Sequence, residues 1–291
     1  MFETRFCLAL LILTVASPLQ AESDHAKNSL FQTVLKEGLT AEGRAIKLQE
    51  PAFRDGMTPE AQMEALKAIA GSERAAREML NDSVTAPHKL AIRDERGAKE
   101  IVRSLDVTFI IHAKLDNLEV DQGLLKGRVE PVEVGNMRFE VEILPPAGSD
   151  SKDVVQTSIR SKSRLLDRIE VEQVDRLMGT RSDESVVVAS RTDLRTGAEG
   201  KPGSFWNAIQ RKGRTESKGP AQPYQGSAGY VKFTRWKGSD GVILVEGHFA
   251  YAEPIAWFDG APILRSKFGL VAQDQIRRLR RELKNAAGSN R

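Results

Sequence analysis

Cysteine is almost absent from this sequence. The single residue of this type, Cys7, lies at the start of an apolar run, and no cysteine follows it. A chain without a second cysteine forms no internal disulfide, and it offers no set of thiolate metal ligands. The position of Cys7 also does not fit a lipid-attachment box. We therefore exclude disulfide-stabilised scaffolds, cysteine-based zinc sites and cysteine nucleophiles for the chain after residue 21.

The sequence motifs of common enzyme classes are missing as well. The chain has no Gly-x-Ser-x-Gly elbow, no His-Glu-x-x-His pair, no phosphate-binding loop and no dinucleotide fingerprint. No acidic loop resembles a calcium-binding hand. These absences favour a non-catalytic protein without a cofactor or a metal.

Long apolar runs are scarce, and the only extended one is at the beginning. Arg5 precedes the apolar residues 6–16, and Ala21 offers a small residue before a polar stretch. This pattern is typical of a secretory signal, and the run is too short to span a bilayer. We expect residues 1–21 to be removed and the protein to be exported to a bacterial periplasm or outside the cell. A retained anchor is the alternative.

The composition is that of an ordinary globular protein. Hydrophobic residues make up 40% and charged residues 29% of the chain, and the formal net charge is +3. Such a small excess does not indicate nucleic-acid binding. Partners that remain open are another envelope protein or an anionic surface.

The clearest structural pattern spans residues 229–271. Residues 237–241 are turn-formers between two β-rich runs, which predicts a hairpin with Trp236 opposite Val242. A third strand is expected at residues 263–271. The register then pairs Thr234 with Leu244, Lys232 with Glu246 and Tyr230 with His248, and it places Val231, Phe233, Val245 and Phe249 on the other face. We expect this second, apolar set to face the core and the first set to face a wetter side.

The wetter face carries the best candidates for catalysis, Glu246 and His248. The two residues are two apart on one strand, so their side chains point the same way, roughly 7 Å apart at ~3.3 Å per residue. Cross-strand pairs on a solvated sheet face explain the same residues more simply. His112 lies on the wetter face of another predicted strand, so His112, His248 and Glu246 or Asp106 would form a metal or catalytic site only if those strands were neighbours.

Helical patterns are found at both ends of the chain, and strand patterns lie between them. Residues 29–37 and 58–81 read as helices, the latter as a helical hairpin. Strands are expected at residues 89–93, 101–113, 132–144 and 186–188, and residues 154–177 are ambiguous but favour strand. Residues 115–125 read either as a short helix or as an excursion between strands.

Two basic regions are candidates for binding. Residues 196–227 are rich in glycine and basic residues, and they form either a mobile flap docked by an apolar pair or a poorly ordered insertion. Residues 273–287 predict an amphipathic helix whose basic face either binds an anionic surface or is simply solvated. The candidate binding residues are Phe205, Trp206, Arg211 and Lys212 in the first region and Arg277 and Arg281 in the second.

Together these observations predict an α+β protein with N-terminal helices, an antiparallel β-sheet meander and a C-terminal amphipathic helix. The expected organisation is a signal peptide at 1–21, a helical segment at 22–85 packed on the main domain, and a domain at 86–291 with a flexible basic insertion at 196–227. The predicted function is that of an exported, non-catalytic envelope protein that binds a partner or ligand. The alternative is an enzyme of unrecognised type that uses Glu246, His248 and His112.

Overall fold

The structure is a computed structural model that describes residues 25–118, 128–134, 136–144, 154–194, 203–213 and 215–288. The predicted leader therefore lies outside the described residues. None of the described helices is both long and apolar enough to cross a membrane. The elements are η1 His25–Lys27, α1 Ser29–Glu37, β1 Leu39–Ala41, β2 Arg44–Ile46, α2 Pro59–Ala70, α3 Glu73–Met79, β3 Lys89–Arg96, β4 Glu100–His112, η2 Leu115–Asn117, β5 Arg128–Val134, β6 Met137–Leu144, β7 Val154–Leu165, β8 Ile169–Arg181, β9 Ser185–Thr192, β10 Phe205–Lys212, β11 Thr215–Lys218, β12 Gln222–Pro223, β13 Ser227–Arg235, β14 Val242–Pro254, η3 Ile255–Trp257 and α4 Ile263–Gly288.

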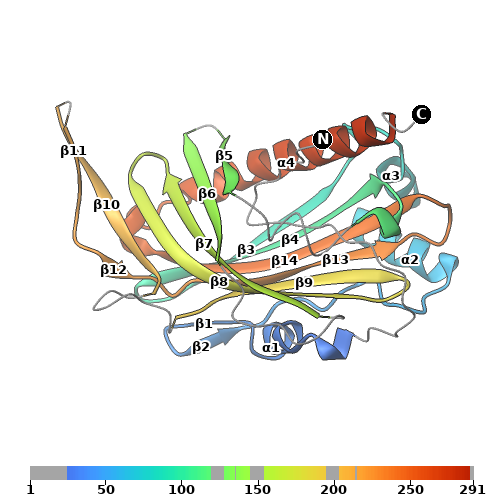
Figure 1. Cartoon of the computed structure of the whole chain (residues 1–291), viewed down its shortest axis with the longest axis horizontal. Coiled ribbons are helices and arrows are strands. Elements are labelled where there is room, and N and C mark those ends of the chain that lie inside the picture. Colours follow the sequence, from blue (N-terminus) through green and yellow to red (C-terminus); the bar gives the residue numbers. More distant parts are fainter. Residues whose placement is uncertain are drawn as a thin grey trace.

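A large antiparallel sheet forms the middle of the molecule. In the described residues it has twelve strands, nine of them in the order β3-β4-β14-β13-β9-β8-β7-β6-β5, and β10 pairs with β8, β11 and β12. Figure 1 shows α4 along one face of this sheet and α1 with the small β1–β2 hairpin on the opposite face. The predicted fold class is confirmed.

The predicted hairpin is formed by β13 and β14 in the predicted register. Tyr230 lies opposite His248 and Lys232 opposite Glu246. The Trp236 N–H donates to the Val242 carbonyl at 2.9 Å. Turn-formers between two β-rich runs therefore specified this pairing correctly.

The expectation of a wetter face on this hairpin is wrong. Lys232 is 5% exposed, Glu246 1% and His248 5%, so this face is as buried as the apolar one. β14 lies in the middle of the sheet between β4 and β13, and the N-terminal elements cover its polar side. The same cover buries Thr108 on β4, which the alternation had placed on a wet side.

The N-terminal elements form a layer on this face, and we call residues 25–85 the N-terminal layer. Phe31 and Val34 of α1 pack with strand residues, and Leu66 of α2 and Met79 of α3 do the same further along the sheet. Thr58 caps α2, with its side chain accepting the Ala61 N–H at 3.2 Å. The N-terminal layer thus buries this face of the sheet with apolar side chains. Polar strand residues that it buries form hydrogen bonds and ion pairs with residues of the layer.

The opposite face is covered by α4, which is longer than predicted. Ile276, Leu279 and Leu283 form the expected apolar stripe against the sheet. The predicted strand at 263–271 is instead the first part of α4, which follows Asp259 and Gly260, both in the left-handed region. Leu264, Phe268 and Val271 belong to one core cluster, and their spacing of three to four residues is helical.

Three further stretches can be compared with the expectations, and only the first needs a correction. Residues 132–144 form part of the β5–β6 hairpin rather than one strand. Residues 154–177 span most of β7 and β8, which pair around Leu166 and Asp167, two residues with positive φ. Of the stretch 115–125, residues 115–117 are the short helix η2, and 119–125 lie outside the described residues.

The described part of the basic insertion is mainly strand. Residues 205–212 form β10, which pairs with β8 along the sheet and with β11 and β12. The β10–β11 hairpin extends away from the body of the molecule (Figure 1). Residues 205–212, 215–218 and 222–223 are therefore strand, which neither alternative for the insertion had specified. Movement of the insertion relative to the sheet stays a prediction.

Candidate functional site

The buried polar face of the β13–β14 hairpin is closed by residues 49–57, which we call the cover segment. The Tyr230 hydroxyl donates to the Gln49 carbonyl at 2.6 Å. Each carboxylate oxygen of Glu246 accepts a backbone N–H, from Ala52 at 2.8 Å and from Phe53 at 3.1 Å. Glu246 therefore acts as an anchor for the backbone of the cover segment.

His248 lies between two carboxylates. Its Nδ1 is 2.7 Å from Asp106 Oδ1, and its Nε2 is 3.9 Å from Glu246 Oε1. Burial would lower the pKa of His248, but the two carboxylates outweigh burial and raise that pKa. Arg93 binds the other oxygen of Asp106 at 2.9 Å. The arrangement stabilises an imidazolium in a closed interior.

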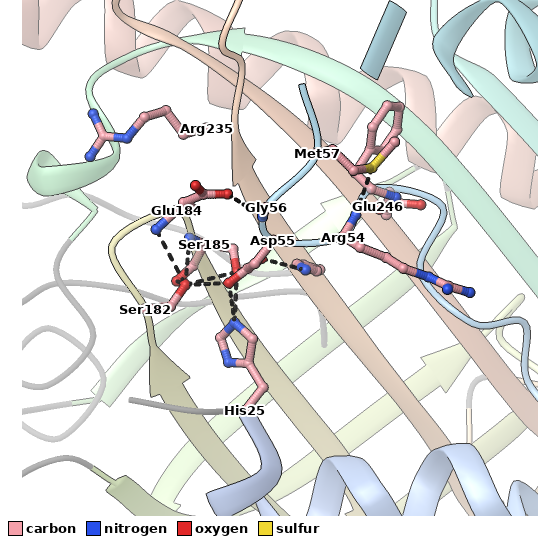
Figure 2. A network of polar contacts seen from close by, with 12 residues as sticks. His25, Arg54, Asp55, Gly56, Met57, Ser182, Glu184, Ser185, Arg235 and Glu246 are labelled. Atoms are coloured by element: carbon pink, nitrogen blue, oxygen red, sulfur yellow. Dashed lines mark hydrogen bonds and ion pairs between the residues drawn. The ribbon is translucent and has the colours of Figure 1, made fainter. Parts of the chain in front are cut away.

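Asp55, in the cover segment, gathers polar groups from distant parts of the chain (Figure 2). Its oxygens accept hydrogen bonds from Ser182 at 2.5 Å, Ser185 at 2.7 Å and Lys232 at 2.8 Å. Burial alone would raise the pKa of Asp55, but these three donors outweigh it and lower the pKa to about 2. We call Asp55, Ser182, Ser185, Lys232 and His25 the Asp55 cluster.

His25 completes the cluster from the start of the N-terminal layer. Its Nε2 is 2.6 Å from Ser185 Oγ and 3.6 Å from Asp55 Oδ2, and its Nδ1 is 3.0 Å from Thr180 Oγ1. In a serine–histidine–aspartate triad the carboxylate binds the imidazole, which in turn binds the serine. Here the carboxylate binds the serine hydroxyl, and Ser185 is fully buried. The cluster has the composition of a triad but a different geometry.

The contacts around the Asp55 cluster also join separate elements. The Glu184 carboxylate accepts the Gly56 N–H at 2.7 Å and pairs with Lys237 at 2.7 Å. Figure 2 shows Ser182, Glu184 and Ser185 around the β8–β9 turn, facing the cover segment. Polar contacts on this side of the sheet therefore hold the N-terminal layer against the strands.

Of the predicted catalytic residues, Glu246 and His248 lie together with Asp106, but His112 does not join them. His112 pairs with Val242 at one end of β14, whereas His248 pairs with Asp106 six residues further along β4. At ~3.3 Å per residue, six residues separate the two histidines by about 20 Å. Among the described residues no group of three or more histidine, cysteine, aspartate or glutamate side chains is arranged to hold a metal ion.

The predicted binding residues of the insertion fall into two groups. Trp206 is partly buried, with its ring centroid 6.2 Å from that of Trp257, and Phe205 on the same strand is half-buried. Arg211 lies 3.4 Å from Glu216 and 3.7 Å from Asp167, and Lys212 is exposed. The aromatic pair therefore starts a strand at the sheet, and the basic pair lies toward the tip of the β10–β11 hairpin.

Two surface hollows lie where edge strand β3 meets α4, and we call residues 85–92 with residues 262–280 the β3–α4 seam. The first hollow, of about 420 Å³, is lined by Leu90, Ile92, Pro262, Arg265 and Ser266. The second, of about 200 Å³, is lined by Thr85, Ala86, Pro87, His88, Gln273, Ile276, Arg277 and Arg280. Both hollows border α4; the first lies against β3 and the second against residues 85–88, which directly precede β3.

Arginines of α4 hold the seam together. Arg265 donates to the Ile92 carbonyl at 3.2 Å, and Arg280 donates to the Ala86 carbonyl at 2.5 Å and the Ile110 carbonyl at 2.9 Å. Of the residues predicted to bind, Arg277 lines the second hollow, whereas Arg281 is exposed and lies outside its lining. Burial, followed by the charges of Arg280 and Arg277, lowers the pKa of His88.

Sequence reasoning did not single out Asp55, His88 or Arg280. Asp55 occurs in a loop-like run, Glu-Pro-Ala-Phe-Arg-Asp-Gly, that carries no motif. Arg280 is one of several basic residues on the last helix, and its burial depends on contacts with residues 84–110. Its place one turn after the apolar Ile276 was the only available sign that it faces inward.

Comparison with known proteins does not assign this chain to a family. The sequence matches no protein-family model, and it has no significant match among curated proteins. Among solved structures, the lipid transfer and protein localization domain of human StarD13 (DLC2) aligns over 79% of this chain and 98% of that domain. The identity is 9% and the TM-score 0.35, a likeness too slight to support an argument about this chain.

Proposed function

We propose that this chain is an exported, non-catalytic binding protein of the bacterial envelope, and that its ligand binds in the β3–α4 seam. The observation that carries the proposal is the contrast between its two polar regions. The titratable groups of the sheet face are occupied by one another and by the cover segment, while the seam opens to solvent in two hollows.

Export is supported by the sequence alone. The apolar residues 6–16 after Arg5 are typical of a secretory signal, and Ala21 gives a small residue for cleavage. On this proposal the mature protein is periplasmic or extracellular and lacks residues 1–21.

The seam has the mixed chemistry of a binding groove. Leu90 and Ile92 give an apolar side to the first hollow, and the second hollow is lined by arginines. Leu270 is 60% exposed, and it lies four residues after Ser266 and seven before Arg277, on the same side of α4. A ligand that covers Leu270 would bury apolar surface and would also contact the arginines of the seam.

A single experiment tests export and binding together, because the chain after residue 21 contains no cysteine. Leu270→Cys is purified from the periplasm of a bacterial host and labelled with a solvent-sensitive maleimide dye. One label per chain is expected; a second label on Cys7 would show that the leader is retained. Small-molecule extract of bacterial envelopes is expected to change the dye signal in a saturable way.

Leu194→Cys is the matched control, since Leu194 is 54% exposed and does not line the seam. Its dye is expected not to respond to the extract. An equal response at both positions, or no response at position 270, would count against the seam as the binding face.

A further inference from the structure

We infer that the 200 Å³ hollow of the seam is a binding site for a phosphate group. The inference rests on the proposed function, because it names the chemistry of the ligand that the seam binds. The hollow lies between residues 85–88 and the second half of α4.

The strongest feature of the hollow is a buried guanidinium without a counter-ion. Arg280 is 7% exposed, and its N–H groups donate to carbonyl oxygens of Ala86 and Ile110, with longer contacts to Val84 and Pro87 at 3.5 and 3.4 Å. No carboxylate among the described residues forms an ion pair with it. Carbonyls satisfy the donors but do not neutralise the charge, and an uncompensated buried charge is unfavourable. A bound anion would supply the missing charge.

A second cation stands next to the first. Arg277 lines the hollow three residues before Arg280, and its guanidinium has no hydrogen-bond or ion-pair partner among the described residues. Asp82 contacts Lys284 at 3.5 Å and Glu282 pairs with Arg278 at 3.0 Å. Asp274, next to Gln273 on α4, is exposed and does not line the hollow. The charged groups lining the hollow are therefore all cationic.

The remaining polar groups of the hollow suit an oxyanion. Thr85 offers a hydroxyl and Gln273 an amide N–H₂ group, and both can donate. His88 also lines the hollow, and it donates through both ring nitrogens once it is protonated. Burial and the two arginines lower the pKa of His88, so a dianion placed among them would raise that pKa.

Charge and size favour phosphate over a carboxylate. The guanidinium fork of Arg277 can bind two oxygens of a phosphate monoester. The buried charge of Arg280, whose donors are taken by carbonyls, balances the second negative charge, which a carboxylate does not have. A volume of about 200 Å³ equals that of roughly seven water molecules at ~30 Å³ each, enough for a phosphate group and a short substituent.

The test measures phosphate binding with His88 as a reporter. The purified mature protein is titrated with inorganic phosphate, and the His88 ring signals are followed by NMR across a pH series. We expect saturable binding and a rise in the pKa of His88. Arg277→Gln should weaken binding at least tenfold, because it removes a charge-assisted contact. Arg281→Gln, which removes the same charge from the exposed side of α4, should leave binding within about twofold.

A second arm distinguishes the source of the phosphate group. Phosphatidylcholine vesicles with and without phosphatidic acid are compared for binding to the same variants. Binding only to phosphatidic acid vesicles, with loss in Arg277→Gln, identifies a lipid headgroup and supports the site. Absence of binding in both arms, or equal weakening by the two glutamine variants, overturns it. A dye response at position 270 without phosphate binding would leave the seam a binding face for another ligand.

Discussion

Asp55 shows how one carboxylate can join segments that are far apart in the chain. It lies 177 residues before Lys232 and 130 before Ser185, and it binds both. Its partner Lys232 is 5% exposed, so the lysine charge depends on Asp55 for compensation. The Asp55 cluster thus stabilises the packing of the N-terminal layer on the sheet.

Replacing Asp55 by Asn should therefore destabilise the protein. The change leaves Lys232 buried without its counter-ion, and we expect a loss of roughly 2–4 kcal/mol in unfolding free energy at pH 7, measured by urea denaturation. Because the pKa of Asp55 is lowered to about 2, its contribution is complete above about pH 4 and is lost as the pH falls through 2. The difference between the two proteins should shrink over that range.

Two further variants make this prediction specific. The double variant Asp55→Asn with Lys232→Met should recover much of the loss, because it removes the buried charge as well. Asp240→Asn, in the exposed β13–β14 turn, should change the unfolding free energy by no more than about 0.5 kcal/mol. If Asp55→Asn lowered the unfolding free energy as little as Asp240→Asn does, Asp55 would not stabilise the contact between the N-terminal layer and the sheet.

The sequence predicted the residues of the sheet face better than it predicted their partners. The turn at 237–241 fixed which residues of β13 and β14 face each other, so the Lys232–Glu246 and Tyr230–His248 pairs were predictable. Strand alternation says nothing about what covers a face. The cover segment, which binds Lys232 and Glu246, lies almost two hundred residues away in the chain and carries no motif.

At the scale of elements, α4 shows where periodicity succeeds and where it fails. The spacing of Ile276, Leu279 and Leu283 predicts a helix, and those residues do face the sheet. Residues 263–271 are too few and too mixed for the same pattern to separate helix from strand, because an apolar run of that length fits both. Pro262 suits the residue before the first helical turn, and this was the one local sign of the true start.

Ile276 and Leu270 offer a matched test of the role of α4. Ile276 is 5% exposed, so Ile276→Ala should lower the unfolding free energy by about 2–4 kcal/mol through lost burial and a residual cavity. Leu270 is 60% exposed, and Leu270→Ala should change it by no more than about 0.5 kcal/mol. Thermal and urea unfolding measure both. Similar effects for the two variants would contradict the packing of α4 on the sheet.

The whole molecule is a three-layer arrangement, with the sheet between the N-terminal layer and α4. Two covered faces leave buried polar groups in the interior, and Asp175 is one of them. Burial raises the pKa of Asp175 to about 6, although hydrogen bonds from Thr192, Gln173 and Ser161 oppose this rise.

The contribution of Asp175 to the free energy of unfolding should therefore fall as the pH rises from about 4 to 6. In that range the folded protein keeps the Asp175 proton while the unfolded chain has lost it, so the unfolded state gains relative stability. A rise of the pKa from 3.8 to about 6 corresponds to about 3 kcal/mol. We expect urea denaturation of Asp175→Asn to show a flatter pH profile than wild type between pH 4 and 6. Parallel profiles would show that Asp175 does not carry this effect.

The order of the strands along the chain also affects the order in which the structure can form. β4 ends at residue 112, but its partner β14 begins at residue 242. Asp106 therefore cannot bind His248 until 142 further residues have been synthesised. During synthesis the apolar sides of α1, α2 and α3 therefore emerge long before the strand that completes the central sheet beneath them. Pairing so distant in sequence makes folding slow and leaves early segments open to wrong association. Because β14 is the last of the described strands to be synthesised, we expect the central sheet to form only when the polypeptide is nearly complete.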